Sequence, residues 1–574
     1  MTAYADYLAA PTRTPVWLVI LTLDFCENTF GSSPCTATGI PCYNTYPTCR
    51  DRLNYVRGTK DYMYTSLNAP LPFPGPRRHI SGIDFFPTEI KTSLTVNNRI
   101  KIRMLDELCG DIGIDPYVAD RDSVQGTHWK KLIARNGGNY KGRPCKAYHG
   151  FIGMTLEEFL AQQRFLGDLD NINIETGGGI IIEAVDPLKK LSDTELPPKL
   201  NTKLVAAMGV DDETATLNDT SELPASGIVK IGDEIIEYDS KNDTTNQLLD
   251  LTRSAWDTEA AEHKEKDKVQ ICEYFPWDNP YEHAQTILTK SSIAAGNIDS
   301  SAFDALKTFP EADIDYRALV TEPTKADKLY FELMDHLDCK SWTNEDLKIT
   351  VEKVLANRPG RSYTEITDNG NIAAKTGQAD LNQISLVTRY ALYWDLKTNG
   401  KLEEPASYSC LAVSPEAEAE SENENNTIVE KTIYSRWIHQ NTPGVTEEAL
   451  DEYVELLITR LTRNHRDALH LVPLSVELKD EALRTGSYVH LSSDILLNPD
   501  GTALDAAPHQ IIKREPKGRQ IDLVLMEQPR KKIAYWAPDD LPDYGDADPD
   551  DKEYGFWCDD NGFMPDGIEG WHFY

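Results

Sequence analysis

Apolar and polar residues alternate over short segments along most of the chain, which is the pattern of β-strands. The strongest apolar run is VWLVILTL at 16–23, which is too short to cross a bilayer as a helix and indicates a buried strand. Further strands are expected at 62–67, 91–104, 141–153 and 177–191. The Gly177–Gly179 run lacks a following helix and a phosphate-loop lysine, so it predicts a turn.

A helical period replaces the alternation in a few places. Helices are expected at 127–136, 280–296, 323–339 and 447–463. In the last of these, Leu450, Val454, Leu457 and Leu461 share one face, with acidic residues in the first turn. The expected class is therefore α+β, mainly β, with a few helices.

The order of these patterns suggests several domains, as expected for 574 residues. A β domain is expected at 1–200, including a cysteine-rich loop at 25–55, and a small inserted β-barrel at 201–272, built around the turn Gly232-Asp233. An α/β domain at 273–405 and a second β domain at 406–530 follow. The segment 531–574 is acidic and aromatic, so we expect it to extend over a surface without a core of its own.

The charge changes this picture, because 93 acidic residues face 58 basic ones and give a net charge of −35. Such a balance argues against a nucleic-acid-binding surface and against an anionic membrane surface. It suits a surface to which passing DNA must not adhere. No basic cluster and cleavage site mark a signal peptide, so we expect folding in a cytoplasm, where thiols stay reduced.

The candidate chemistry lies in the loop at 25–55, which is rich in Gly, Pro, Ser, Thr and Asn. It carries Cys26, Cys35, Cys42 and Cys49, separated by eight, six and six residues. Four thiols on one irregular loop indicate that something holds the loop together. The spacing alone leaves four possibilities open: an iron–sulfur cluster, two disulfides, a zinc ion, or plain buried thiols.

The sequence lacks the common motifs of catalytic, zinc and nucleotide-binding sites. There is no Gly-x-Ser-x-Gly elbow, paired-histidine zinc helix, phosphate loop or dinucleotide fingerprint. His128, His149 and His283 each have the chemistry of a base, but isolated histidines are usually structural. The remaining cysteines are scattered singly and are expected to be small buried apolar residues.

The cysteine loop resembles the N-terminal region of tail-tip (baseplate) hub proteins of long-tailed phages and gene-transfer particles, most specifically in CYNTYPTCRDRLNY. It is also similar to the four-cysteine iron–sulfur segment of lambda-type tail-tip proteins. The resemblance continues in the same order through most of the chain. It includes SGIDFFPTEI, GIDPYVADRD, HWKKLIARN, EAVDPLKKLSD, SGIVKIGDEIIEYDS and IAYWAPDDLPDYGDADPDDKEYGFWCDDNG.

This resemblance implies a structural virion protein and not an enzyme. Proteins of this family form a homotrimeric hub, built from tail-hub β-barrel domains, that joins the tail tube to the distal tip and fibre. They contact the distal tail ring, the tube and the tape-measure protein, and they line the channel through which DNA leaves. The resemblance places a 4Fe-4S cluster on Cys26, Cys35, Cys42 and Cys49, with a structural role by default. It also implies a virion tail tip assembled in the host cytoplasm, without stable membrane insertion.

Two other classes stay open from the sequence. The first is an enzyme, either a tail-associated cell-wall hydrolase or a cluster-dependent redox protein. The second is a β-rich adhesin with two disulfides in the cysteine loop. A hydrolase should show a clustered His, Asp or Glu set, and a redox protein a second cofactor motif.

Overall fold

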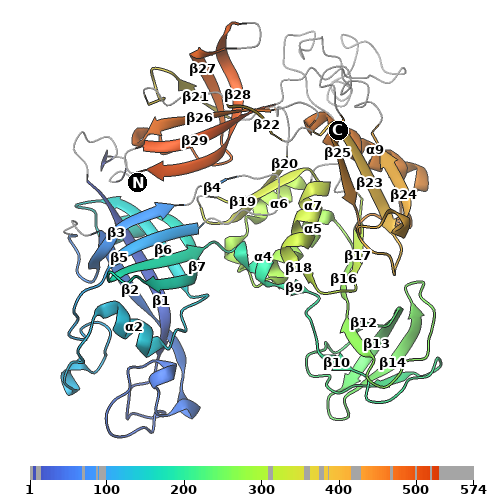
Figure 1. Ribbon diagram of the computed structural model, residues 1–574, viewed down its shortest axis with the longest axis horizontal. Helices are drawn as coiled ribbons and strands as arrows, with labels where there is room; N and C mark the ends of the chain where they lie inside the picture. The colour runs from blue at the N-terminus through green and yellow to red at the C-terminus, as the bar shows by residue number, and fades with distance from the viewer. Residues whose placement is uncertain are drawn as a thin grey trace.

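The chain folds into an arch with two legs (Figure 1). One leg is a closed barrel near the N-terminus and the other is a small sheet, with a helical centre between them and further sheets above. The computed structural model describes residues 4, 6–7, 14–66, 71–85, 88–89, 99–307, 314–344, 346–353, 362–373, 380–384, 387–414, 428–465, 469–497, 501–517 and 520–528. The acidic run at 415–426, whose composition predicts an exposed loop, and the segment 531–574 lie outside the described residues.

The first leg is a closed seven-stranded barrel in the order β1-β2-β3-β5-β8-β7-β6. Its strands are β1 (Pro15–Cys26), β2 (Arg57–Ser66), β3 (Arg77–Phe85), β5 (Arg99–Leu105), β6 (Pro144–Phe151), β7 (Gln163–Ile174) and β8 (Gly179–Val185). β1 pairs with both β2 and β6, which closes the barrel. β7 and β8 form a hairpin whose turn holds Gly178 at φ +85°, so the predicted turn is confirmed.

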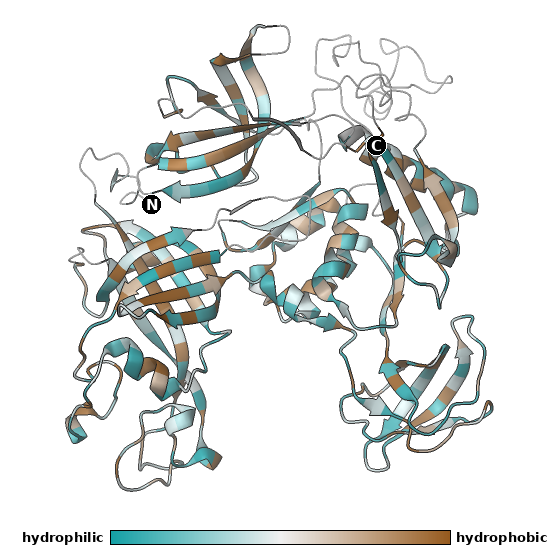
Figure 2. Cartoon of the chain, in the orientation of Figure 1, coloured by the Kyte–Doolittle hydropathy of each residue, from teal (hydrophilic) through white to brown (hydrophobic). Residues whose placement is uncertain are grey.

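β1 is buried on both faces, which explains its unbroken apolar run. Val19 and Leu21 point into the barrel core, whereas Leu18 and Ile20 pack in a second core shared with the sheet above. Figure 2 shows the brown strands of this barrel beneath that sheet. A strand with one face in water would alternate instead.

The sheet above the barrel has seven strands, in the order β21-β27-β28-β29-β26-β22 with β4 paired to β28. They are β4 (Thr88–Glu89), β21 (Tyr363–Thr367), β22 (Asp380–Ile384), β26 (Leu469–Glu477), β27 (Tyr488–Leu497), β28 (Ala503–Lys517) and β29 (Gln520–Glu527). Leu474, Leu491 and Leu523 contribute to the core shared with β1. The barrel and this sheet are therefore packed directly against each other.

The second leg is a six-stranded sheet with a core of its own. Its strands are β10 (Thr202–Lys203), β11 (Thr214–Thr216), β12 (Gly227–Ile231), β13 (Glu234–Asn242), β14 (Gln247–Ala255) and β15 (Lys268–Ile271). Gly232, at φ +61°, turns the chain between β12 and β13, as predicted. The two edges of the sheet meet, since the Val205 amide donates to the Thr216 carbonyl over 3.0 Å.

The centre combines helices and short strands around the largest apolar core. The helices are α4 (Lys189–Asp193), α5 (Pro280–Lys290), α6 (Ser300–Leu306), α7 (Ala326–His336) and α9 (Glu447–His465); α2 (His128–Asn136) and α3 (Leu156–Leu160) belong to the first leg. The strands are β9 (Glu195–Leu196), β16 (Glu273–Asp278), β17 (Tyr316–Val320), β18 (Thr324–Lys325), β19 (Cys339–Thr343), β20 (Ile349–Lys353), β23 (Arg389–Leu396), β24 (Tyr408–Val413) and β25 (Glu430–Tyr434). No helix among the described residues is long and apolar enough to cross a membrane.

The mainly β class with a few helices is confirmed, and two details need correction. The helix expected at 280–296 ends at Lys290, because Ser292 adopts φ +59° and turns the chain. The boundary expected between 405 and 406 does not separate two sheets. β21 and β22 pair with strands that follow residue 468, whereas β24, β25 and α9 join the central core.

Candidate functional site

The cysteine loop leaves the barrel where β1 ends at Cys26 and returns where β2 begins at Arg57. These two residues are paired in register, so the loop is closed at its base by the barrel itself. A second excursion, residues 106–143 between β5 and β6, lies against it and contains α2 (Figure 1). Both segments project from one end of the barrel.

Asn44 organises the inside of the loop. Its backbone has φ +54°, a left-handed conformation that Asn tolerates better than most residues, and its carbonyl accepts a hydrogen bond from the Cys26 amide over 2.7 Å. Its side-chain amide donates to the carbonyls of Cys26 and Asn28, each over 3.2 Å. The buried Asn44 thus joins the start of the loop to its middle, beside Cys42.

Tyr43 fixes the loop to the second excursion. Its ring lies between two guanidinium groups, with Arg135 at 3.8 Å and Arg121 at 4.3 Å from its centroid. Such cation–π contacts are worth about 0.5–2 kcal/mol each. Arg121 also donates to the carbonyls of Pro41 and Cys42, over 2.7 and 3.0 Å. The two residues before Tyr43 are therefore held by the same arginine.

Two buried carboxylates hold those arginines. Asp115 pairs with Arg121 at 2.8 Å, and Asp111 pairs with Arg135 at 2.6 Å and with Lys131 at 3.2 Å. Burial opposes ionisation of Asp111, but hydrogen bonds from the Val124 amide, Arg135 and Lys131 outweigh it and lower the pKa of its carboxyl group. The charges beneath the loop are thus paired in an ordered network.

The cysteine loop also contacts the C-terminal end of α2 closely. Thr45 donates from its hydroxyl to the Arg135 carbonyl over 2.6 Å, at the end of α2. Gly137 caps that helix at φ +59°, and a Cβ there would lie 2.9 Å from the ring of Pro47. Glycine is therefore required both by the backbone conformation and by the approach of the loop.

The four cysteines predicted as ligands all lie on this loop. Cys26 and Cys42 are buried, Cys35 and Cys49 are partly exposed, and all four are free thiols. Burial raises the pKa of the Cys42 thiol, and the charges of Cys49, Cys26 and Cys35 raise it further. Burial likewise raises the pKa of Tyr55 to about 12, with Cys26 adding to the effect. The Cys42 sulfur thus lies within electrostatic range of the other three cysteines.

Four cysteine thiols are chemically suitable ligands for a metal ion or an iron–sulfur cluster. Ionising these thiols together is unfavourable, because their negative charges repel, and a cationic group among them would offset that cost. Within the described part of the chain, however, no group of three His, Cys, Asp or Glu side chains is already arranged to hold a metal ion. The loop therefore carries the four thiols without a formed coordination sphere.

The other candidate residues serve the core. Cys109, Cys145, Cys272 and Cys339 are buried and Cys410 is partly exposed, while Cys558 lies outside the described residues. The three histidines considered as bases are also buried. Burial lowers the pKa of His128 to about 3 and of His149 to about 4, and also lowers that of His283. These rings are neutral at pH 7 and packed among other side chains.

Arg121 and Arg135, with their carboxylate partners, are site residues that the sequence did not single out. They lie about 80 to 90 positions beyond the cysteines they support. No local spacing marks them, because the contact arises only when the two excursions meet at the end of the barrel. The sole signal is the series of acidic and basic residues in GDIGIDPYVADRD.

No protein-family model matches the chain, and no curated protein matches it. Among solved structures, it is similar to a tail protein from Neisseria meningitidis MC58, with 9% identity over 79% of this chain and 93% of that one, at a TM-score of 0.34. A 43 kDa tail protein of prophage MuSo2 from Shewanella oneidensis also has 9% identity, over 78% and 96%, at 0.34. Prophage tail protein gp18 from Listeria monocytogenes EGD-e has 11% identity, over 77% and 87%, at 0.32.

Proposed function

We propose that this chain is a structural virion protein, the homotrimeric central hub of a phage tail tip. In this role it joins the tail tube to the distal tip and fibre, contacts the distal tail ring and the tape-measure protein, and lines the channel through which DNA leaves. The support is the ordered resemblance of its sequence segments to tail-tip hub proteins, together with a mainly β architecture built on a closed barrel. No catalytic step is assigned to it.

We further propose that Cys26, Cys35, Cys42 and Cys49 hold a 4Fe-4S cluster with a structural role. The observation that carries this proposal is how little the loop buries. Between Cys26 and Arg57, the buried residues are Cys42, Asn44, Thr45 and none of the large apolar ones. A cluster supplies bonds from iron to thiolate sulfur, which replace a missing apolar core, as structural metals do in small domains.

The chain's own groups prepare this site. The Asn44 hydrogen bonds and the Arg121–Tyr43–Arg135 stack hold the backbone after Cys42, and the hydrogen bond from Arg121 to the Pro41 carbonyl holds the backbone before it. Arg121 adds positive charge beside the Cys42 carbonyl. These contacts fix the loop to the barrel end and so limit the positions that its four thiols can take.

The test is purification without oxygen, followed by measurement of iron, sulfide and visible absorption. We expect about four irons per chain and a broad band near ~400 nm. Cys42→Ser should lose most of the iron and yield defective tails. Cys410→Ser, which changes a partly exposed cysteine outside the loop, should retain both iron and normal tails. A colourless, iron-free wild-type protein with normal tails would exclude the cluster.

A further inference from the structure

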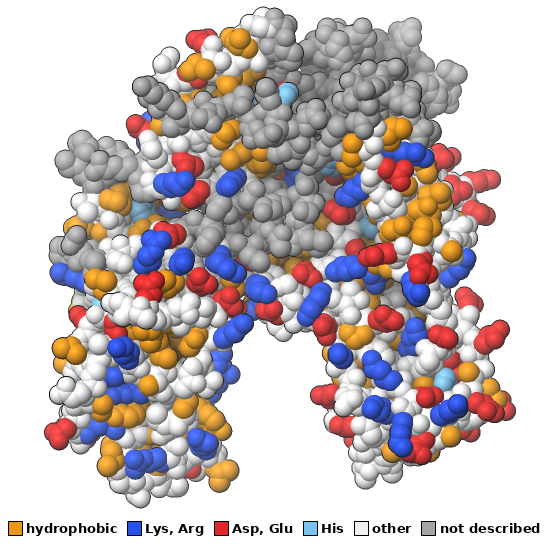
Figure 3. All heavy atoms as spheres, in the orientation of Figure 1, with side chains coloured by type: hydrophobic (Ala, Val, Ile, Leu, Met, Phe, Trp, Pro, Cys, Tyr) orange, Lys and Arg blue, Asp and Glu red, His pale blue; other side chains and the backbone are white. Residues whose placement is uncertain are grey.

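Large apolar side chains are exposed at the far end of the first leg. They come from the cysteine loop and the neighbouring 106–143 excursion, with one from the end of β5. We call them the apolar tip: Ile40, Tyr46, Leu53, Val56, Leu105, Leu108, Ile112 and Val124. Leu53 is 99% exposed, Leu108 83% and Ile112 71%. Figure 3 shows apolar side chains gathered over the lower part of this leg. A concentration of this kind marks an interaction surface.

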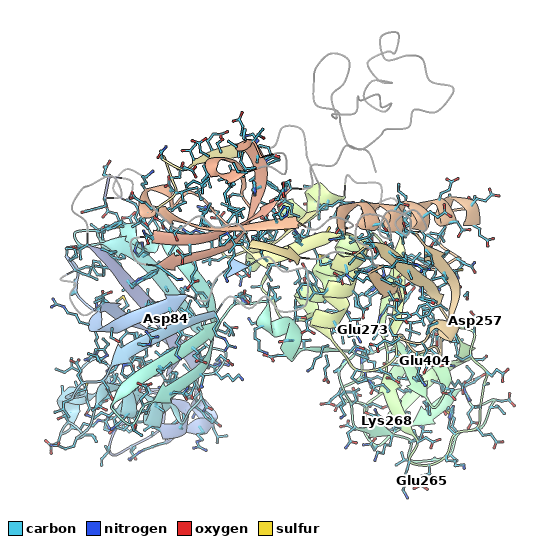
Figure 4. All side chains as sticks on the ribbon, turned by 45° about the horizontal axis from the view of Figure 1, so that its top comes forward. Asp84, Asp257, Glu265, Lys268, Glu273 and Glu404 are labelled. Atoms are coloured by element: carbon cyan, nitrogen blue, oxygen red, sulfur yellow. The ribbon has the colours of Figure 1, made fainter. Side chains whose placement is uncertain are left out.

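The charge of the chain is unevenly distributed. Residues 1–200 contain 22 acidic and 22 basic residues, so the whole net charge of −35 belongs to residues 201–574. Within the barrel, acids are commonly paired, as Asp84 is with Arg103 on the adjacent strand. Figure 4 labels Asp84 on this leg, and Asp257, Glu265 and Glu273 on and around the acidic second leg. The apolar tip therefore stands on a part of the chain that has no net charge, in an otherwise acidic molecule.

We infer that the apolar tip is the surface through which copies of this chain meet, each tip packing against the neutral barrel of the next copy. This rests on the homotrimer of the proposed function and assigns its interface. Three copies would carry a formal charge of −105, so contacts between their acidic parts are opposed by repulsion. The neutral barrel end escapes that repulsion and offers the apolar area that stabilises association.

The cysteine loop gains a second role from this arrangement. Ile40, Tyr46 and Leu53 lie on the same loop as the four thiols. Holding the loop to the Arg121–Tyr43–Arg135 stack presents these side chains in a fixed arrangement, which lowers the entropy lost on association. The loop anchor is therefore also an interface anchor.

The test measures the mass of the full chain by light scattering during size-exclusion chromatography, at about 50 and 300 mM salt. The wild type should form a trimer, and salt should strengthen it, because screening removes repulsion between acidic parts while leaving apolar contact intact. Leu53→Asp with Leu108→Asp should weaken association about tenfold or more. These side chains are too exposed to support the fold, so the circular dichroism spectrum should not change.

The matched control is Ile495→Asp with Leu497→Asp, which replaces two exposed apolar residues on β27, away from the tip. This variant should associate as the wild type does. Equal weakening in both variants, a trimer unaffected by the tip variant, association that salt weakens, or aggregates without a defined mass would each overturn the inference. A chain that is monomeric at both salt concentrations would also overturn it, and electron microscopy of labelled particles would then judge the tail-tip role separately.

Discussion

At the scale of single residues, Tyr43 makes the contact on which the cysteine loop depends most. Its ring makes cation–π interactions with Arg121, which also binds the Cys42 carbonyl, and with Arg135 at the end of α2. An alanine at this position removes both contacts and leaves the two guanidinium groups without the ring between them. The loop then loses about 2 kcal/mol of attachment.

This loss can be measured by proteolysis, since Arg50 and Arg52 are exposed trypsin sites on the loop. Tyr43→Ala should raise the rate of cleavage there about 30-fold, as follows from ~2 kcal/mol of easier local opening. Tyr43→Phe keeps the ring and should stay within a few-fold of the wild type. Equal rates for Tyr43→Ala and the wild type would show that the stack does not hold the loop.

At the scale of elements, β1 connects two cores. Leu21 lies in the barrel interior and Leu18 lies in the core shared with the seven-stranded sheet. We expect Leu18→Ala and Leu21→Ala each to cost about 2–5 kcal/mol of unfolding free energy. Thr22→Ala removes only the exposed hydrogen bond from the Thr22 hydroxyl to Asp61, so it should cost about 1 kcal/mol or less of unfolding free energy. Chemical denaturation followed by tryptophan fluorescence tests this; a mild Leu18→Ala would mean that the sheet is not packed on the barrel.

The junction between the barrel and this sheet also contains a buried polar cluster. The Tyr4 hydroxyl donates to Glu481 over 2.6 Å and lies 3.1 Å from His149 Nδ1, while Arg164 pairs with Glu481 at 2.9 Å. Burial lowers the pKa of His149 to about 4, with Glu481 opposing and Arg164 and Arg514 adding to the effect. Burial opposes ionisation of Glu481, but Arg164, Tyr4 and His149 together lower its pKa.

Both shifts predict that acid loosens the junction. His149 has its ordinary pKa near 6.5 when unfolded, so between pH 6.5 and about 4 only the unfolded state binds the proton. Stability is therefore lost as the pH falls through this window, by up to about 3 kcal/mol from this residue. The stabilisation from Glu481 is lost at still lower pH, as its lowered folded-state pKa is passed.

The measurement is the unfolding midpoint from pH 7 to 4. His149→Gln should show a flatter profile than the wild type, because its share of the proton linkage is gone. His470→Gln, which changes an exposed histidine on β26, should keep the wild-type slope. Superimposable profiles for all three proteins would exclude His149 as a source of acid sensitivity.

The sequence was a good guide where a local pattern determined the element. The β12–β13 hairpin, the turn between β7 and β8, and α9 follow from glycines and from a regular apolar face. β7 was not predicted, although Phe165 and Leu169 face the core, because glycine and acidic residues interrupt its alternation. Packing partners that are distant in sequence could not be predicted. The run at 16–23 indicated a buried strand, but nothing in it identified the sheet that covers its second face.

At the scale of the whole molecule, the negative charge that would repel DNA is confined to residues 201–574. The neutral first 200 residues contribute nothing to repulsion of a phosphate backbone. If the channel repels DNA, residues 201–574 must line it. The proposed meeting of neutral barrels and an acidic channel then belong to different parts of the same chain.

The second leg gives the clearest test of this division of labour, because it is nearly separate. Its core consists of residues between Leu200 and Val269, and Thr202 is paired in register with Val269, so the two ends of the unit lie side by side. A small apolar cluster that includes Ile235, Trp256 and Leu319 joins it to the centre, with Arg317 lying 5.0 Å from the Trp256 ring. The Asn399 side chain also donates to the Asp233 carbonyl over 2.8 Å. The rest of the molecule keeps its three large cores without it.

Replacing residues 201–272 by a short Gly-Ser linker should therefore leave the rest folded. The unit carries 16 acidic and 7 basic residues, so its removal takes away nine negative charges. With less repulsion between copies and the apolar tip unchanged, the shortened chain should associate at lower salt than the wild type. Calorimetry should show the main transition unchanged, whereas Ile231→Asp, which disrupts only the core of the unit, should abolish a separate minor transition. Loss of the main transition on excision would mean that the second leg is an integral part of the centre and not an attached unit.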